Sequence, residues 1–358
     1  MGWLGSRLAA GPNDCAIGTQ STCGSMPYIQ RPGAKASLTN VEVETRAMDF
    51  GAHLPLMDFG GHPYTLDHLA TYTKTAAQLG FRALSVNDHL VFSVPWLDGP
   101  VALAAVMEHT GEMTLATTVA LAVVRGPVSL AKTFGAIDRL SEGRLLVAVG
   151  PGSSPDDYAA VGLDFSERWQ RFDEAIGALR ALWRPGGPPF VGRFYSTDGL
   201  SLEPLPAQPD GPPIWVGSWG SDAGLRRVAR LADGWLASAY NTTPELFSEA
   251  WQALLVQLED RGKPSDTFPN AIATMWCYIT DDRAEADRVL QERVVPTVHR
   301  PVDMLRERLP IGPPELFAEK LTAFAKAGAQ RVYIWPVADE IHQLERFWNE
   351  VRPLVDIT

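Results

Sequence analysis

The chain has 358 residues, of which 46% are hydrophobic and 20% are charged, a composition typical of a globular protein. Its formal net charge of -11 argues against nucleic acids and anionic membranes as partners, because phosphate groups bind to cationic surfaces. The three cysteines, Cys15, Cys23 and Cys277, show no C-x-x-C spacing, so we expect neither a disulfide framework nor a zinc site.

The first 47 residues show neither helical nor strand periodicity and are rich in Gly, Ser, Pro and Thr. We therefore predict a disordered N-terminal tail over residues 1–47 and a single folded domain over residues 48–358. No apolar run approaches the roughly 18 residues of a membrane helix, and the tail lacks the apolar core of a signal peptide. We accordingly expect a cytoplasmic protein that does not bind membranes and acts on a small molecule.

From Met48 onward, short runs rich in β-branched residues alternate with longer amphipathic stretches. The predicted strands are residues 49–55, 83–89, 114–121, 144–150, 213–218, 234–239, 271–280 and 331–337. Helical periodicity between them is clearest in residues 66–80, 128–143, 167–183 and 315–328. Strand-plus-helix units repeated in this way predict an α/β fold, a closed (β/α)8 TIM barrel; an open doubly wound sheet is the alternative.

Two segments interrupt this alternation. Residues 184–212 are too rich in proline and aromatic residues for a crossover helix, and residues 294–314 contain the proline-bearing runs "VVPTVHRPVD" and "PIGPP". The loops that follow the strands of such a barrel form its active-site face. We therefore expect both insertions to shape or cover the binding pocket.

Polar, glycine and aromatic residues stand at the carboxyl ends of the predicted strands. They are His53, Asp88, His89, Thr117, Thr118, Gly150, Pro151, Gly152, Gly217, Ser218, Trp276, Tyr278 and Trp335. The chain has no H-E-x-x-H motif, no Gly-x-Ser-x-Gly elbow, no Walker loop and no carboxylate cluster typical of metal sites, so hydrolases and metalloenzymes are disfavoured. The pattern favours a site that binds an organic ring and contains no metal.

Two strand ends continue into glycine-rich loops that precede helices, "VGPGSSP" at 149–155 and "VGSWGSD" at 216–222. Both combine close backbone approach with hydroxyl groups and free helix amides, a combination that binds phosphate. In the second loop, we expect Ser221 or Asp222 to cap the following helix. The alternative for each loop is an ordinary turn and helix cap, and for His89 it is a structural histidine.

Several stretches resemble the luciferase-like monooxygenase superfamily. They are "NDHL" after the second strand, the strand end "VGPGSSP", "GLDFSER" and "LADGW", in this order. The resemblance extends from about Met48 to Trp235 and more loosely to the end of the chain, and it implies a TIM barrel of the bacterial luciferase-like type with insertions. The Asp-His pair in "NDHL" resembles the branch of this superfamily that uses coenzyme F420, a 5-deazaflavin, instead of FMN.

The resemblance also implies roles for individual residues. Thr117, Thr118 and Val119 occupy the third-strand bulge, where relatives hold a non-prolyl cis peptide behind the flavin-like ring. Here that bond would join Thr118 to Val119. His89 would be catalytic, since it would lie near the reactive centre of the ring, orient it and relay a proton.

Further positions are assigned to cofactor binding. They are His53, Asp88, Gly150, Pro151, Gly152, Gly217, Ser218 and Trp219. The resemblance implies that residues 150–152 line the ring and ribityl chain and that residues 217–219 bind the phosphate. Ser153 stands where the sugar-phosphate dehydrogenases of this branch have Glu, which argues against glucose-6-phosphate dehydrogenase activity.

Three hypotheses for the function follow. The first is a coenzyme F420-dependent oxidoreductase that moves a hydride between the deazaflavin and a small organic substrate. The second is an FMN-dependent monooxygenase that uses reduced flavin and oxygen, and the third is a non-catalytic protein that binds a flavin or deazaflavin. The family pattern also leads us to expect a homodimer.

Overall fold

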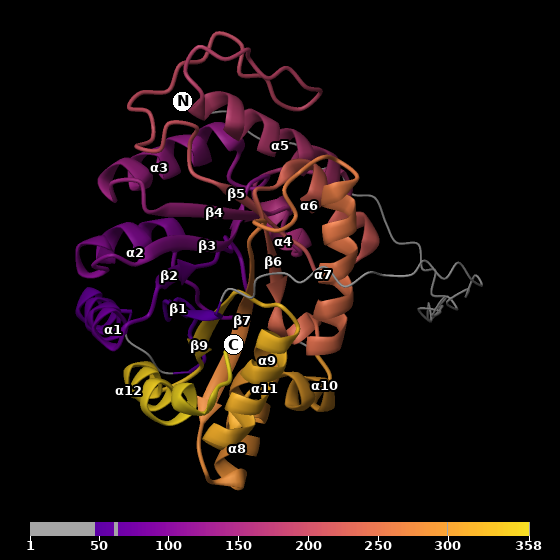
Figure 1. Cartoon of the computed structure of the whole chain (residues 1–358). Coiled ribbons are helices and arrows are strands. Elements are labelled where there is room, and N and C mark those ends of the chain that lie inside the picture. The colour runs from indigo at the N-terminus through magenta and orange to yellow at the C-terminus, as the bar shows by residue number, and fades with distance from the viewer. Residues whose placement is uncertain (1–46, 61–63, 299, 358) are drawn as a thin grey trace, which may run out of the picture. The chain divides into compact units, whose positions relative to one another are not determined.

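The computed structural model describes residues 47–60, 64–298 and 300–357, and within them eight parallel strands close into a barrel (Figure 1). The strands follow one another in chain order around the barrel, and the last of them, β9, pairs with β1. They are β1 (Asp49–His53), β2 (Ala83–Val86), β3 (Thr114–Leu121), β4 (Leu145–Gly150), β5 (Ile214–Gly217), β6 (Gly234–Ser238), β7 (Asn270–Ile279) and β9 (Arg331–Pro336). The predicted (β/α)8 fold is confirmed, while residues 1–46 of the predicted tail lie outside the described residues.

The eight predicted strands all occur, with small differences at their ends. The largest is in β2, which ends at Val86 and not at residue 89, because the chain turns there and the Asp88 side chain is bound to Arg125. A short strand, β8 (Ile311–Gly312), pairs with the carboxyl end of β7 and is not part of the barrel.

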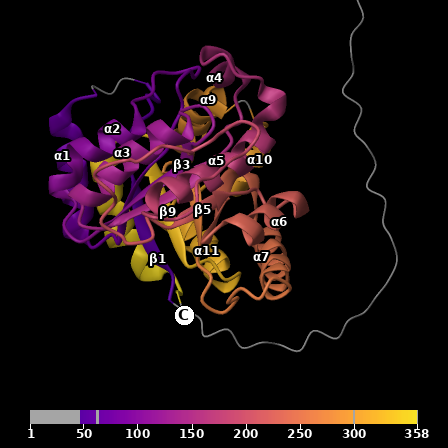
Figure 2. The same cartoon turned by 90° about the horizontal axis from the view of Figure 1, so that it is seen from above.

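Helices surround the barrel, as Figure 1 and the view from above in Figure 2 show. The helices that follow barrel strands directly or after an excursion are α1 (Leu66–Leu79), α2 (Gly99–Val106), α3 (Pro127–Leu140), α5 (Arg168–Trp183), α6 (Asp222–Leu231), α7 (Pro244–Glu259), α11 (Pro314–Lys326) and α12 (Glu340–Arg346). Shorter helices in the connections are α4 (Pro155–Ala160), α8 (Arg283–Val289), α9 (Val295–Val298) and α10 (Val302–Arg308). None of the helices within the described ranges has the length and apolarity needed to cross a bilayer.

The ends of α1 illustrate why these sequences form helices. The Thr65 side chain accepts a hydrogen bond from the amide of His68, which satisfies one of the free N–H groups of the first turn. At the other end Gly80 adopts φ 96°, a left-handed conformation that stops the helix and favours glycine. The predicted helix over 66–80 is therefore confirmed to within one residue.

Large side chains fill the barrel interior. Leu146, Trp215, Leu236 and Tyr333 pack there with five alanines from four strands. Side chains that alternate between the inner and outer faces of the strands produce this packed interior, as is usual for TIM barrels. A ligand must therefore bind beyond it, at the carboxyl ends of the strands.

The two insertions leave the barrel at different places. Residues 294–314 belong to the connection after β7, so this insertion follows a strand, as expected. Residues 184–212 follow helix α5, and the amides of Arg193 and Phe194 donate to the carboxylate of Glu174 on that helix. The interpretation of residues 184–212 as an insertion in a loop that follows a strand is wrong, because this segment connects helix α5 to β5 and packs along the helix.

Candidate functional site

A separate apolar cluster lies at the carboxyl ends of the strands, beyond the residues that fill the barrel. Six of its seven aromatic side chains contact one another ring to ring, and we call these six the aromatic cluster: Phe59, Phe92, Trp96, Tyr240, Trp276 and Trp335. Leu290, Val294, Leu305 and Leu309 from the connection after β7 pack in the same cluster. The insertion at 294–314 thus contributes to the cover of the strand ends.

His53, at the end of β1, adjoins the aromatic cluster. Its ring stacks on Trp335, with 3.6 Å between the centroids and 11° between the planes. Its Nδ1 lies 2.7 Å from the Leu54 carbonyl oxygen, which can only accept, so Nδ1 carries the proton. Burial lowers the pKa of His53 to about 3, partly offset by the Leu54 carbonyl and the nearby Asn87 side chain. The ring is therefore neutral, and its Nε2 is a buried acceptor that forms no hydrogen bond of ordinary geometry with the described residues.

His89 also contacts the aromatic cluster. Its ring contacts Phe92 and Trp96, with centroid distances of 4.7 and 4.9 Å. Its Nδ1 lies 2.7 Å from a carboxylate oxygen of Asp157, at the start of α4. An ionised carboxylate only accepts, so Nδ1 carries the proton and Nε2 of a neutral His89 is left as a base.

Asp157 is held in place by more than His89. It is fully buried, and its second oxygen accepts from the amides of Leu90 at 2.8 Å and Val91 at 2.9 Å. Burial by itself would raise the pKa of Asp157, but the hydrogen bonds from His89 and from these amides outweigh burial and lower it. Asp157 is therefore ionised at neutral pH, and it fixes both the ring orientation and the tautomer of His89.

Asp88 is bound by Arg125. Its two oxygens accept from Nε and Nη2 of Arg125, each at 2.6 Å, and one of them also accepts from the amide of Leu121. Its carboxylate therefore ties the end of β2 to the turn after β3. A contact between Asp88 and a cofactor stays a prediction.

The third strand contains the irregularity that the resemblance implies. The peptide bond between Thr118 and Val119 is cis, and the register of β3 against β4 shifts between Thr118 and Ala120. The hydroxyl groups of Thr117 and Thr118 donate to the carbonyl groups of Ala148 and Val86. Both threonines thus hold the bulge against the neighbouring strands, and each hydroxyl oxygen can still accept a hydrogen bond.

Gly150 and Gly217 make room for Val119. A Cβ atom at either glycine would lie 2.9 Å from a methyl carbon of Val119, closer than side chains pack. Two of the glycines assigned to cofactor binding thus allow the side chain at the bulge to point between β4 and β5. Gly152 differs, because its φ of 91° favours glycine and its neighbour Pro151 accepts from the Tyr158 hydroxyl through its carbonyl.

The loop after β5 has the features of a helix cap. Ser221 accepts from the amide of Gly224 at 3.3 Å, which confirms it as the N-cap of α6. The Ser218 hydroxyl accepts from the amide of Gly220 and is buried, while Trp219 is 55% exposed. The ordinary cap is therefore present, and phosphate binding by this loop stays a prediction.

Unsatisfied indole N–H groups distinguish the aromatic cluster from the rest of the core. The indole nitrogens of Trp96, Trp276 and Trp335 are buried and have no hydrogen-bond partner among the described residues. By contrast, the buried Trp183 and Trp235 donate to backbone carbonyls at 3.1 and 3.0 Å. A buried donor without an acceptor costs about 1–3 kcal/mol, so a ligand or ordered water that supplies acceptors to these three donors would stabilise the cluster.

Together these groups suit a flat, polar-edged organic ring. The walls are aromatic, the tryptophans offer donors, His53 offers an acceptor, and His89 offers a base on a fixed carboxylate. No group of three or more His, Cys, Asp or Glu side chains in the described ranges could hold a metal ion. The arrangement can bind a heteroaromatic ring and move one proton.

Two residues of this site were not predicted from the sequence. Asp157 is the partner of His89, and Trp96 contacts both the His89 ring and Trp335, at 4.9 and 6.1 Å between centroids. The acidic pair Asp156 and Asp157, at the start of a helix directly after the glycine-rich strand end, was a usable signal for the first. Nothing in the local pattern of "NDHLVFSVPW" separates Trp96 from a core residue.

Replacing His53 with Phe tests the buried neutral histidine. The folded protein keeps His53 unprotonated down to about pH 3, whereas the unfolded chain takes up a proton near the ordinary pKa of 6.5. Stability carried by His53 is therefore present above pH 6.5 and is lost as pH falls from there toward 3. When the pH is lowered from 7 to 5, the free energy of unfolding of the wild type should fall by about 2 kcal/mol more than that of His53→Phe. Urea unfolding at the two pH values measures this difference. Equal losses would contradict a buried neutral ring.

Replacing Asp157 with Asn tests the carboxylate behind His89. The lowered pKa of Asp157 stabilises the folded state above the ordinary value of 3.8, and this contribution disappears as pH falls below it. The stability gap between wild type and Asp157→Asn should therefore be widest near pH 6 and shrink toward pH 3 in urea titrations. The exposed neighbour Asp156 is the matched control, and Asp156→Asn should show no such gap. If the difference in stability between wild type and Asp157→Asn did not change with pH, the charge of Asp157 would not contribute to folding stability.

Comparison with known proteins places these features in a family. The sequence pattern of the family described as "Luciferase-like monooxygenase" matches residues 48–331. The chain is 29% identical over 233 residues to an "F420-dependent hydroxymycolic acid dehydrogenase" of Mycobacterium tuberculosis, which covers 62% of each protein. It is 28% identical over 319 residues to an "F420-dependent glucose-6-phosphate dehydrogenase" of Beutenbergia cavernae, covering 80% of this chain and 92% of that one. The match thus spans less than two thirds of the first relative's length.

A solved structure extends the likeness to the fold. An F420-dependent secondary alcohol dehydrogenase, in complex with an F420-acetone adduct, has a TM-score of 0.73 at 18% identity. The likeness covers 87% of this chain and 100% of that one, and at this identity it concerns the fold alone. Because the family pattern covers most of the barrel, the chain belongs to the luciferase-like monooxygenase family.

Proposed function

We propose that this protein is an oxidoreductase that uses coenzyme F420 to transfer a hydride to or from a small organic substrate. The observation that carries the proposal is the set of unsatisfied polar atoms around the aromatic cluster at the strand ends. The names of the two curated relatives, both F420-dependent dehydrogenases, support the choice of cofactor.

The residues present fit a deazaflavin ring. Its carbonyl oxygens would supply acceptors to the indole groups of Trp96, Trp276 and Trp335, and its ring N–H would supply a donor to Nε2 of His53. Val119, on the cis peptide, would support one face of the ring. The predicted contacts of residues 150–152 with the ribityl chain and of residues 217–219 with the phosphate complete this assignment.

Bound coenzyme F420 supplies a ring carbon that carries a hydride, so the protein's own task is positioning and proton transfer. When an alcohol is oxidised, its carbon gives up the hydride and its hydroxyl gives up a proton. Nε2 of His89 is the base that takes this proton, because Nδ1 is committed to Asp157. Such general-base help is worth about 10²–10⁴ in rate. The apolar cover from the connection after β7 excludes water from the reaction.

An FMN-dependent monooxygenase is the alternative, since the family name includes that activity. The same aromatic walls and unsatisfied polar atoms would fit the FMN ring. The homodimer expected from the family pattern and the non-catalytic binding role likewise stay predictions.

Titration with the two cofactors separates these possibilities. Purified protein should bind oxidised coenzyme F420 with a change in cofactor fluorescence and should bind FMN at least about tenfold more weakly. His89→Ala should bind coenzyme F420 as wild type does but should lose about 10²-fold or more in hydride transfer to ketone, enone or imine acceptors. The exposed His342 is the control, and His342→Ala should keep both properties.

Other outcomes decide the remaining hypotheses. Tighter binding of FMN would favour the monooxygenase. Binding of neither cofactor would contradict the proposal altogether. Tight binding of coenzyme F420 without turnover of any acceptor would favour a non-catalytic protein, and full turnover by His89→Ala would exclude His89 as the base.

A further inference from the structure

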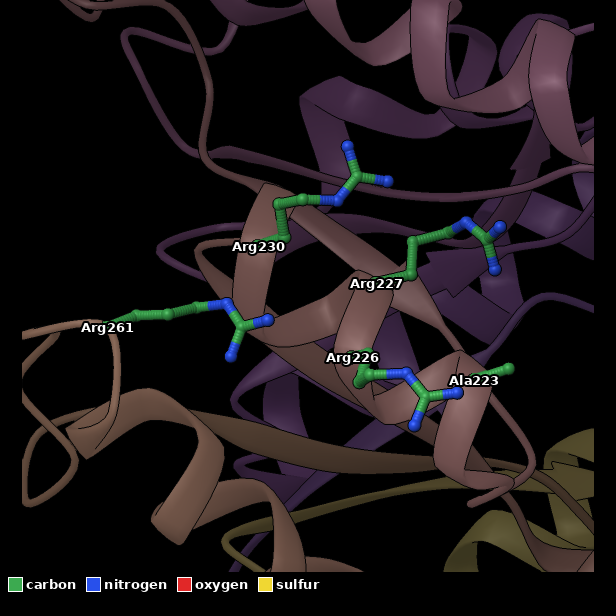
Figure 3. A pocket seen from close by; sticks show the side chains of 5 residues that line it. All are labelled: Ala223, Arg226, Arg227, Arg230 and Arg261. Carbon is green, nitrogen blue, oxygen red and sulfur yellow. The ribbon is translucent and has the colours of Figure 1, made fainter.

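Four arginines surround a shallow hollow beside α6 (Figure 3). The hollow encloses about 330 Å³ and is lined by Ala223, Arg226, Arg227, Arg230 and Arg261. Three of the arginines stand on α6, and Arg261 extends toward them from the turn after α7. We call these four residues the arginine cluster.

The arginine cluster carries more positive charge than its neighbours neutralise. Arg226 forms an ion pair with Asp222, and the other two arginines of α6 share Asp173 of α5 at 2.5 Å each. Arg261 donates to the backbone carbonyl of Gln257. Four guanidinium groups thus have two carboxylate partners in these contacts, although the whole chain carries a net charge of -11.

Most of these side chains remain accessible. Arg226 is 55% exposed and Arg230 is 52% exposed, and Arg261 is also exposed. Each guanidinium has five N–H donors, more than its contacts here use, and the planar group binds carboxylates in pairs of hydrogen bonds. The hollow is therefore suited to an anionic ligand with several carboxylates.

The arginine cluster is continuous with the loop predicted to bind the cofactor phosphate. Ser221 caps α6, and Ala223, in the first turn of this helix, already lines the hollow. The free amides and the dipole at this end attract an anion. From Ala223 to Arg230 the helix covers roughly 10 Å, at about 1.5 Å per residue. A positive surface therefore begins at the predicted phosphate loop and continues along α6.

We propose that the arginine cluster binds the oligo-γ-glutamate tail of coenzyme F420, an inference that rests on the proposed function. Beyond its phosphate this coenzyme carries a lactyl group and a chain of γ-linked glutamates, each with a free carboxylate. A few extended glutamates cover the length of the cluster, at roughly 3.5 Å or more per residue. FMN ends at its phosphate, so the arginine cluster recognises the part of coenzyme F420 that FMN lacks.

Binding measurements with two forms of the coenzyme test this inference. The short form ends at the lactyl group, and the long form carries several glutamates. Wild type should bind the long form about tenfold more tightly at low ionic strength, and salt should reduce this advantage because the contacts are exposed. The double variant Arg226→Gln/Arg261→Gln should lose the advantage and keep wild-type affinity for the short form.

A matched control removes two exposed arginines outside the cluster, Arg139 and Arg184. The double variant Arg139→Gln/Arg184→Gln should retain the advantage of the long form. Equal affinity of wild type for both forms would overturn the inference and leave the proposed function intact. Binding of neither form would instead contradict the proposed function. If Arg226→Gln/Arg261→Gln still bound the long form more tightly than the short form, the tail would bind outside the arginine cluster.

Discussion

The stack of His53 on Trp335 depends on the closure of the barrel. The two residues stand at opposite ends of the folded chain, and they meet because β1 and β9 pair in a register that aligns Ala52 with Ile334. The same closure places the ends of the other strands around one opening, where the aromatic cluster gathers. The site is thus a consequence of sheet topology, since its residues come from different strands and connections.

The polar groups at the strand ends fall into two classes, those with a hydrogen-bond partner in the protein and those without one. The carboxylate of Asp88 and the hydroxyl groups of Thr117 and Thr118 have protein partners and hold the strands and turns in place. Nε2 of His53 and the indole nitrogens of Trp96, Trp276 and Trp335 have no such partner among the described residues. Satisfied groups cost little to bury, whereas unsatisfied ones are tolerated where a ligand completes them. This division separates the scaffold from the surface that we assign to the cofactor.

The barrel itself was predictable from the sequence, because strand and helix periodicities are local and repeat along the chain. The cis bond from Thr118 to Val119 was also predictable, but through family resemblance and not from propensity. The partner of His89 was not, since Asp157 lies 68 residues away and contacts it only in the folded state. The contact of Gly150 with Val119 was not predictable either, because it joins two strands of the folded barrel, and the cofactor contact assigned to Gly150 stays a prediction. Contacts between distant segments leave no periodic trace in the sequence.

The loop before α6 shows that a local sequence pattern can fit two functions. The sequence of this loop is typical of both a phosphate site and a helix cap, and in the structure Ser221 caps the helix. A cap and an anion site use the same free amides, so one does not exclude the other. The arginine cluster along its surface distinguishes this helix. The sequence did not reveal the cluster, because Arg261 follows α7 and lies beside α6 only in the folded structure.

A crystal structure with bound coenzyme F420 would test most directly whether the unsatisfied polar atoms belong to a cofactor site. We predict that the deazaflavin ring lies against the aromatic cluster and gives hydrogen-bond partners to Nε2 of His53 and to at least one indole of Trp96, Trp276 and Trp335. A ring bound elsewhere, with all four nitrogens still unpartnered, would contradict the assignment of this site.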